Sequence, residues 1–206
     1  MSGKVFFISL LFPIIVSFKT YKPEPPELKA VSRLYQKADS LFNLSNASRL
    51  TDSIAMNTFH EVAARLAALE RNQTTDSILF KSLYQEAVLL EEYGKFGQAT
   101  RTYLNALPYA PDESGKLKIY VLAGSGYYSQ NNFDSANYFL LKAEESPGDL
   151  LETEDQVRLY NTLGVLYYDN GNYLQSKNYF SQALAVIKKH GTAYQGYALG
   201  VQLNMA

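Results

Sequence analysis

The chain has 206 residues, a formal net charge of −1 and no cysteine, and hydrophobic residues make up 47% of it. This composition is typical of a globular protein, and a near-neutral charge argues against a nucleic-acid-binding protein, which carries a basic surface. The absence of cysteine excludes disulfides, thiolate metal sites and a cysteine nucleophile. Seventeen tyrosines and no tryptophan make the aromatic content unusual.

Residues 1–20 predict an export segment. A short basic start is followed by the apolar stretch Val5–Phe18, which at about 14 residues is too short to cross a bilayer as a helix and fits a secretory signal peptide. No clear A-x-A motif marks a cleavage site before Lys19, so an uncleaved N-terminal anchor and a buried first helix stay open as alternatives. We expect an exported protein, periplasmic or extracytoplasmic. The alternative is a protein that stays anchored in the membrane by its N-terminus.

The proline-rich residues 21–27 predict an extended spacer, because proline disfavours a helix interior and favours the polyproline II conformation. From Leu28 onward apolar residues recur at intervals of three and four, as in Ala30, Leu34 and Ala38, which indicates helices. No stretch alternates with period two. We therefore predict an all-α fold, an α-α superhelix of helical hairpins without a β-sheet.

Polar, glycine and proline residues divide the helical part. We expect helices to start at Thr51-Asp52-Ser53, at Thr74-Thr75-Asp76 and at Asp134-Ser135, whose side chains suit helix N-termini. The predicted breaks are Ser45–Thr51, Arg71–Thr75, Pro108–Lys116, Ser146–Thr153 and Gly191–Thr192.

The helical part repeats itself. A shift of 40 positions places Gly164 on Gly124, and a further shift of 37 places Ala136 on Ala99. Small residues allow the two helices of a hairpin to approach closely, because a larger side chain would overpack the contact. Gly94, Asn131 and Gly171 would close the first helix of each unit, since these residue types accept a positive φ. Aromatic residues would then fill each turn, namely Phe96, Phe133 and Tyr173.

These units resemble tetratricopeptide repeats (TPRs), helical hairpins of about 34 residues. The copies span 80–113, 117–150 and 157–190. The sequence departs from the family at Glu86, where leucine is usual, and at Lys188, where the closing proline is usual. The residues at the family's packing positions are Ala87, Gly94, Ala99, Tyr103, Ala106, Gly124, Tyr127, Ala136, Leu140, Ala143, Tyr160, Leu163, Gly164, Tyr167, Ser176, Phe180 and Ala183.

Both ends of the array depart from the repeat pattern. Residues 28–79 predict a degenerate N-terminal hairpin that caps the array, in which Asp39 and Asn43 interrupt the first helix. Residues 192–206 predict the first helix of a truncated further repeat. Its apolar residues, such as Val201 and Leu203, have no evident packing partner in the sequence, so we expect a longer repeat protein or self-association through this helix.

The resemblance implies a groove lined by the first helix of each copy. Some TPR proteins hold a peptide carboxylate there with Lys, Asn and Arg, and this chain lacks that clamp. Its mixed polar and tyrosine-rich lining suits an extended segment or a partner helix; alternatively, Tyr128 and Tyr168 only pack against neighbouring repeats. The implied groove residues are Lys81, Tyr84, Val88, Glu91, Lys118, Val121, Ser125, Tyr128, Ser129, Arg158, Asn161, Val165, Tyr168 and Asp169.

No motif in the chain indicates catalysis, and we expect no enzyme activity, cofactor or metal. Phosphate-binding loops, a nucleophile elbow and HExxH are absent from the sequence. We interpret His60 and His190 as helix residues without a ligand role, and the acidic pairs Glu91–Glu92 and Glu144–Glu145 as solvated.

The predicted function is a protein–protein interaction or scaffold module that binds a peptide segment or partner helix in the groove. The repeat region is similar to N-terminal arrays of larger bacterial proteins of the Bacteroidetes type, in which a caspase-like (CHAT) peptidase domain or a histidine kinase follows. The alternative is an extracytoplasmic sensor or regulatory region of such a signalling protein. We expect a protein or peptide partner, no nucleic acid, and no integral membrane domain beyond the N-terminal anchor.

Overall fold

The computed structural model describes residues 25–146, 150–191 and 195–205. The predicted export segment 1–20 and most of the predicted spacer lie outside these residues. Within the described ranges the chain forms nine α-helices, one short 3-10 helix and no strand, which confirms the all-α prediction. No helix in this part of the chain is long and apolar enough to cross a membrane.

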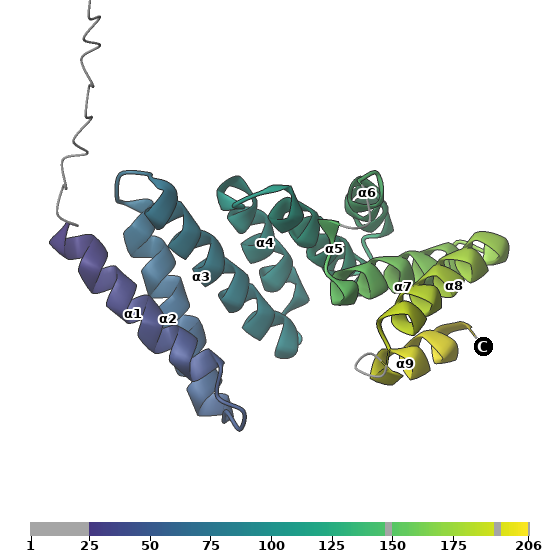
Figure 1. Cartoon of the computed structure of the whole chain (residues 1–206), viewed down its shortest axis with the longest axis horizontal. Helices are drawn as coiled ribbons and strands as arrows, with labels where there is room; N and C mark the ends of the chain where they lie inside the picture. The colour runs from purple at the N-terminus through teal and green to yellow at the C-terminus, as the bar shows by residue number, and fades with distance from the viewer. Residues whose placement is uncertain (1–24, 147–149, 192–194, 206) are drawn as a thin grey trace, which may run out of the picture.

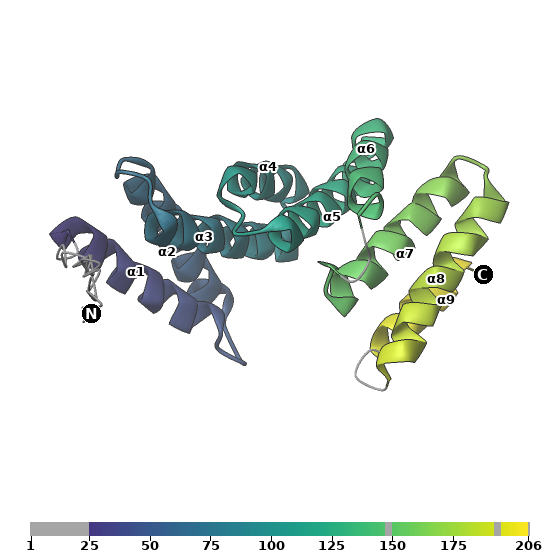
Figure 2. The ribbon, with the colours of Figure 1, turned by 45° about the horizontal axis from the view of Figure 1, so that its top comes forward.

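Consecutive helices pair as antiparallel hairpins that stand in a row (Figure 1). The hairpins are α1–α2, α3–α4, α5–α6 and α7–α8, and α9 packs against α8. The hairpin α7–α8 is turned relative to α3–α4, which gives the row a superhelical twist (Figure 2). The helices are α1 (Pro26–Phe42), α2 (Arg49–Ala67), α3 (Gln73–Glu92), α4 (Phe96–Ala106), α5 (Glu113–Ser129), α6 (Phe133–Glu144), α7 (Thr153–Asp169), α8 (Tyr173–His190) and α9 (Gln195–Met205).

Helices α2, α3 and α6 start earlier than the sequence predicted, at caps that the prediction missed. Ser48 accepts a hydrogen bond from the backbone N–H of Thr51, and Asn72 accepts from that of Thr75. Asn132 likewise caps α6. The predicted starters instead lie inside the first turn, because a capping side chain accepts from an N–H two or three residues further on.

The cap at Asn72 also moves a repeat boundary. Helix α3 begins at Gln73, so the predicted boundary between residues 79 and 80 runs through a helix. Helix α1 likewise begins at Pro26, so the predicted spacer is wrong at residues 26 and 27. The first turn of a helix accepts proline, because its missing N–H has no intrahelical partner there.

The turns inside the three predicted copies have the expected backbone. Gly94, Asn131 and Gly171 have φ values of 68°, 58° and 74°, so the prediction of positive φ at these positions is confirmed. The sequence also predicted that the aromatic residues after them fill the turns, and this is wrong for two of the three. Phe133 is 36% exposed and Tyr173 is 64% exposed.

The exposure of these two rings has a simple cause. Each lies in the first turn of its second helix and packs on the aromatic residue near the end of the first helix, with ring centroids 5.8 Å apart for Phe133 and Tyr128 and 5.3 Å for Tyr173 and Tyr168. These ring pairs lie at the surface and stabilise the turns from outside.

Close helix packing at the small residues is confirmed. A Cβ atom placed on Gly124 would lie 2.6 Å from Cγ of Leu140, and one placed on Gly164 would lie 2.5 Å from Cε1 of Phe180. Both distances are well inside van der Waals contact. Ala87 is the equivalent residue of α3 and is fully buried.

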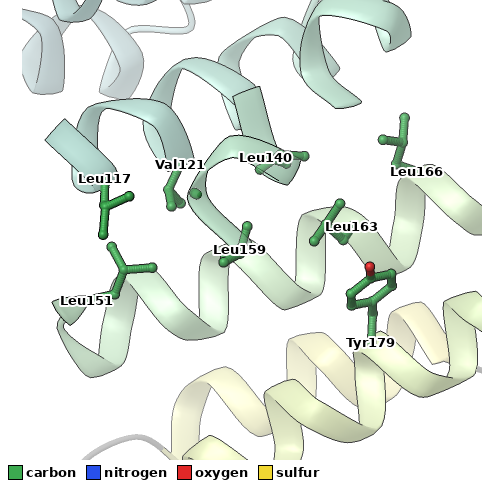
Figure 3. Packing of buried hydrophobic residues seen from close by; sticks show 9 residues of the cluster. Leu117, Val121, Leu140, Leu151, Leu159, Leu163, Leu166 and Tyr179 are labelled. Atoms are coloured by element: carbon green, nitrogen blue, oxygen red, sulfur yellow. The ribbon is translucent and has the colours of Figure 1, made fainter. Parts of the chain in front are cut away.

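The hydrophobic core is a row of clusters, each shared by neighbouring hairpins. In one of them, Leu117 of α5 and Leu140 of α6 pack with Leu159 and Leu163 of α7 and with Tyr179 of α8 (Figure 3). Other clusters join α1, α2 and α3, or α3, α4 and α5. A row of local cores, each shared by neighbouring units, is characteristic of a helical-repeat fold.

Helices α1 and α9 form the ends of the row. Asp39 does not interrupt α1, because its Oδ1 accepts a hydrogen bond of 2.6 Å from Nε2 of Gln85 on α3. In α9, Val201 is 2% exposed and packs in a cluster with Phe180 of α8. The prediction that Val201 lacks a packing partner is therefore wrong. Leu199 and Leu203 of the same helix are exposed.

Candidate functional site

The first helices α3, α5 and α7 share one side of the row, which we call the inner surface. A cavity of about 430 Å³ lies there, and we call it the central cavity. Three predicted groove residues of α3 line it, together with one from α5 and one from α7. These residues are Tyr84, Val88, Glu91, Lys118 and Arg158.

Six further residues line the central cavity and were not predicted as groove residues. Tyr103 was predicted only as a packing residue of the repeat. Glu154 and Asp155 precede the predicted start of the third copy at residue 157, but α7 begins at Thr153. A spacing of three or four residues before Arg158 puts both acids beside it on the helix. The six are Glu92, Phe96, Tyr103, Leu122, Glu154 and Asp155.

An ion pair joins two first helices that are not consecutive. Nη1 of Arg158 on α7 lies 2.6 Å from Oε1 of Glu91 on α3. The other oxygen of Glu91 accepts a hydrogen bond of 3.0 Å from the Tyr103 hydroxyl. Burial and the charge of Glu91 raise the pKa of Tyr103, so this hydroxyl stays protonated and donates. Glu91 is thus held from two sides.

Lys118 forms a second charged cluster on the cavity wall. Its Nζ lies 3.1 Å from Glu152, 3.5 Å from Oδ2 of Asp155 and 5.3 Å from the ring centroid of Tyr84. Burial lowers the pKa of Lys118, but the neighbouring Tyr84, Asp155 and Glu152 outweigh burial and raise it above the ordinary value. Lys118 therefore carries its positive charge throughout the physiological range.

Asp155 is the most buried carboxylate of this cavity. It is 4% exposed, and burial raises its pKa although Lys118 opposes this. Its Oδ2 accepts no hydrogen bond from any described residue and faces Nζ of Lys118 at the longer ion-pair distance of 3.5 Å. The cavity wall thus presents a buried acceptor with unused capacity.

A second cavity of about 420 Å³ lies between α7 and α9, and we call it the end cavity. It shares Glu154 and Arg158 with the central cavity. The predicted groove residue Asn161 lines it and accepts a hydrogen bond of 3.0 Å from Nδ2 of Asn204. The rest of its lining consists of Val157, Gly196, Tyr197, Gly200, Val201, Leu203 and Asn204.

The other predicted groove residues lie outside the two cavities. Val121 is fully buried in the core between α5 and α7, so its assignment to the groove was wrong. Val165 also packs against a core cluster. In each case the helix position faces a neighbouring helix. Of the remainder, Lys81 and Ser129 are exposed at the surface.

Polar contacts between α5 and α7 account for further predicted residues. The Tyr128 hydroxyl donates a 2.8 Å hydrogen bond to Asp169, and the Ser125 and Thr162 hydroxyls lie 3.1 Å apart. The alternative role of Tyr128, packing against the neighbouring repeat, fits this contact. Tyr168 is 52% exposed.

The histidines lie away from the inner-surface cavities. His60 is exposed on α2, with Nδ1 3.0 Å from Oε1 of the buried Glu86. His190 lies in the last turn of α8. Across residues 25–146, 150–191 and 195–205, no group of three or more His, Asp or Glu side chains is arranged to hold a metal ion.

No protein-family model and no curated protein matches the sequence. Among solved structures, the chain is similar to the crystal structure of BtubC (BKLC) from P. vanneervenii. The two share 16% identity with a TM-score of 0.59, and the match covers 87% of this chain and 80% of that one. At this identity the similarity shows a common fold and carries no statement about function.

Proposed function

We propose that the chain is a TPR-type interaction module that binds an extended segment of a partner protein on its inner surface and performs no catalysis itself. The observation that carries this proposal is the central cavity. Five residues assigned to a groove from the repeat pattern, on three different first helices, line this one cavity. Its volume of about 430 Å³ lies in the usual range of ligand pockets, about 300–1,000 Å³.

The chemistry of the inner surface supports a peptide as the ligand. Aromatic and aliphatic side chains such as Tyr84, Val88 and Leu122 stand beside ion-paired groups. Anchor pockets of this mixed kind accept alternate side chains of an extended segment, while polar groups at the rim bond to its backbone. Neighbouring cavities along the surface allow several anchors from one segment.

A peptide-display selection tests the proposal. Random peptides are selected on the immobilised full-length chain, and the enriched peptides are then measured against Glu154→Trp. Glu154 is exposed and lines both cavities, so a tryptophan there obstructs the surface without entering the core. We expect the selected peptides to lose binding to this variant and to keep binding to Glu145→Trp, which lies at the end of α6. Equal binding to both variants would place the ligand elsewhere.

We further propose that the protein is exported, on the sequence pattern of residues 1–20 alone. A periplasmic reporter fused after residue 30 tests this, with activity expected only when residues 1–20 are present. The sensor-region alternative stays a prediction of the sequence.

A further inference from the structure

We propose that the inner surface selects partner segments that place a basic side chain in the central cavity and a large apolar side chain in the end cavity. This inference rests on the proposed function and deepens it by naming the chemistry of the segment. Three observations support it: the charges of the central cavity, the open space in the end cavity, and the residues that line both cavities.

The central cavity has an excess of negative charge. Four carboxylates line it against two cations, Lys118 and Arg158. Both cations are already engaged, Arg158 by Glu91 and Lys118 by Asp155 and by Glu152. A cationic ligand group is therefore attracted by the acidic wall, and the two resident cations oppose it only in part.

A buried acceptor independently indicates a donor ligand. Asp155 is 4% exposed, lines the cavity, and has an Oδ2 that accepts no hydrogen bond from the described residues. The ion pair with Lys118 is the charge contact of this oxygen, but a buried acceptor without a hydrogen bond is costly, and the N–H groups of an arginine or lysine side chain would supply one. Arginine and lysine carry donors only, so they match an acceptor-rich wall.

The field around Glu92 agrees with this assignment. Burial raises the pKa of Glu92, and the negative charges of Asp52 and Glu91 raise it further, as expected beside an acidic wall. The aromatic ring of Phe96 also lines the wall and offers apolar surface to the methylene stem of a basic side chain.

The end cavity has a more apolar part beside the charged residues that it shares with the central cavity. Val157, Val201 and Leu203 contribute aliphatic walls. Gly196 and Gly200 also line it, and a Cβ atom on either would meet no atom within 4 Å. Gly124 and Gly164 differ, because a Cβ atom there would overlap a neighbouring helix. The glycines of α9 therefore border open space that a large apolar side chain of the ligand can fill.

The two cavities are neighbours, because Glu154 and Arg158 line both. An extended segment advances about 3.3 Å per residue, so one short segment reaches both cavities. The same acidic wall repels an acidic segment, and this repulsion gives selectivity as well as affinity.

Fluorescence anisotropy with short peptide pools tests the inference on the full-length chain. The peptides of each pool are random except for two fixed residues. The fixed residues are Arg and Leu in the first pool, Glu and Leu in the second, Arg and Ser in the third, and Ser and Ser in the fourth. We expect the Arg–Leu pool to bind about tenfold more tightly than each of the others, equal to about 1.4 kcal/mol. Its binding should also weaken as salt is added, because exposed charges are screened.

Matched variants assign each cavity its role. Gly200→Leu fills the end cavity and should reduce Arg–Leu binding to the level of the Arg–Ser pool. Gln202→Leu adds the same side chain to an exposed position of α9 outside the cavity and should leave binding unchanged. Glu154→Gln should weaken Arg–Leu binding by removing one carboxylate from the acidic wall, whereas Glu145→Gln, which removes the same charge at the residue after α6, should have no effect. Melting temperatures of all variants confirm that they fold.

The outcomes separate the two proposals. If the Glu–Leu or Ser–Ser pool binds as tightly as the Arg–Leu pool, and Glu154→Trp still abolishes that binding, the basic–apolar inference is overturned and the binding function stands. If no pool binds and the display selection enriches no peptide, both proposals are overturned.

Discussion

At the scale of single residues, alanine substitutions of two glycines test how closely the helices pack. In Gly164→Ala the new methyl group meets the ring of Phe180, so we expect a loss of about 1–3 kcal/mol of unfolding free energy. In Gly200→Ala the methyl group meets open space, and we expect a gain of about 0.5–1 kcal/mol because alanine favours the helix. Denaturant unfolding measures both. A neutral result for Gly164→Ala would contradict the close helix approach in the third repeat.

Glu86 is a second residue with a measurable effect on stability. It occupies a position where the resembled family has leucine, it is 8% exposed, and its Oε2 has no hydrogen-bond partner among the described residues. We expect Glu86→Leu to raise the unfolding free energy by about 1 kcal/mol, because it removes a poorly solvated carboxylate. Glu61→Leu, on the exposed side of α2, is the control and should have little effect.

The Glu86 variant also has a predicted pH dependence. Burial raises the pKa of Glu86 above 4.5, and His60 opposes this in part. The folded state therefore holds this proton more tightly than the unfolded chain, so the group makes the fold less stable as pH rises through its folded pKa. The advantage of Glu86→Leu over the wild type should grow across that window from pH 4.5 upward. A constant difference in unfolding free energy would contradict the shift.

At the scale of elements, each turn inside a repeat needs one residue with a positive φ. Gly171 has φ of 74°, and a Cβ atom there would touch nothing. Gly171→Ala should therefore cost about 1–2 kcal/mol through the left-handed conformation alone. Asn131→Gly, at the equivalent turn, should not reduce stability. Thermal unfolding compares the two, and an Ala variant as stable as the wild type would contradict the turn geometry.

Much of the element structure was predictable because it depends on local chemistry. Gly94 and Gly171 end helices because glycine accepts a positive φ. The small residues at 124 and 164 recur after 40 positions, which the sequence shows directly. The helix starts were missed by one or two residues because a capping side chain precedes the turn that it stabilises. Asp39 was misjudged because its partner Gln85 is far away in the sequence.

The candidate site was predictable only in part, for a similar reason. The repeat register identified Tyr84, Lys118 and Arg158, since each lies at a groove position of its own copy. It missed Asp155 because that residue precedes the copy, and it misplaced Val121 because helix rotation decides which face is buried. The pairing of Glu91 with Arg158 depends on the curvature of the row, which no local pattern encodes.

At the scale of the whole molecule, the Glu91–Arg158 pair links α3 with α7. We expect a double-mutant cycle with Glu91→Gln and Arg158→Gln to give a coupling of about 1–3 kcal/mol, because the pair is half-buried and Glu91 is also held by Tyr103. The exposed pair of Glu61 and Arg65 within α2 is the matched control, with about 0.3–0.5 kcal/mol expected. Equal couplings would contradict a link between these two helices.

Amide chemical-shift mapping tests whether the inner surface binds a partner segment. An Arg–Leu peptide is titrated into the full-length labelled chain. We expect the shifted amides to lie on α3, α5, α7 and α9 and around Phe96 and Tyr103 of α4, the residues of α4 that line the central cavity. Shifts confined to α6 and α8, or no shifts at saturating peptide, would contradict binding at the inner surface.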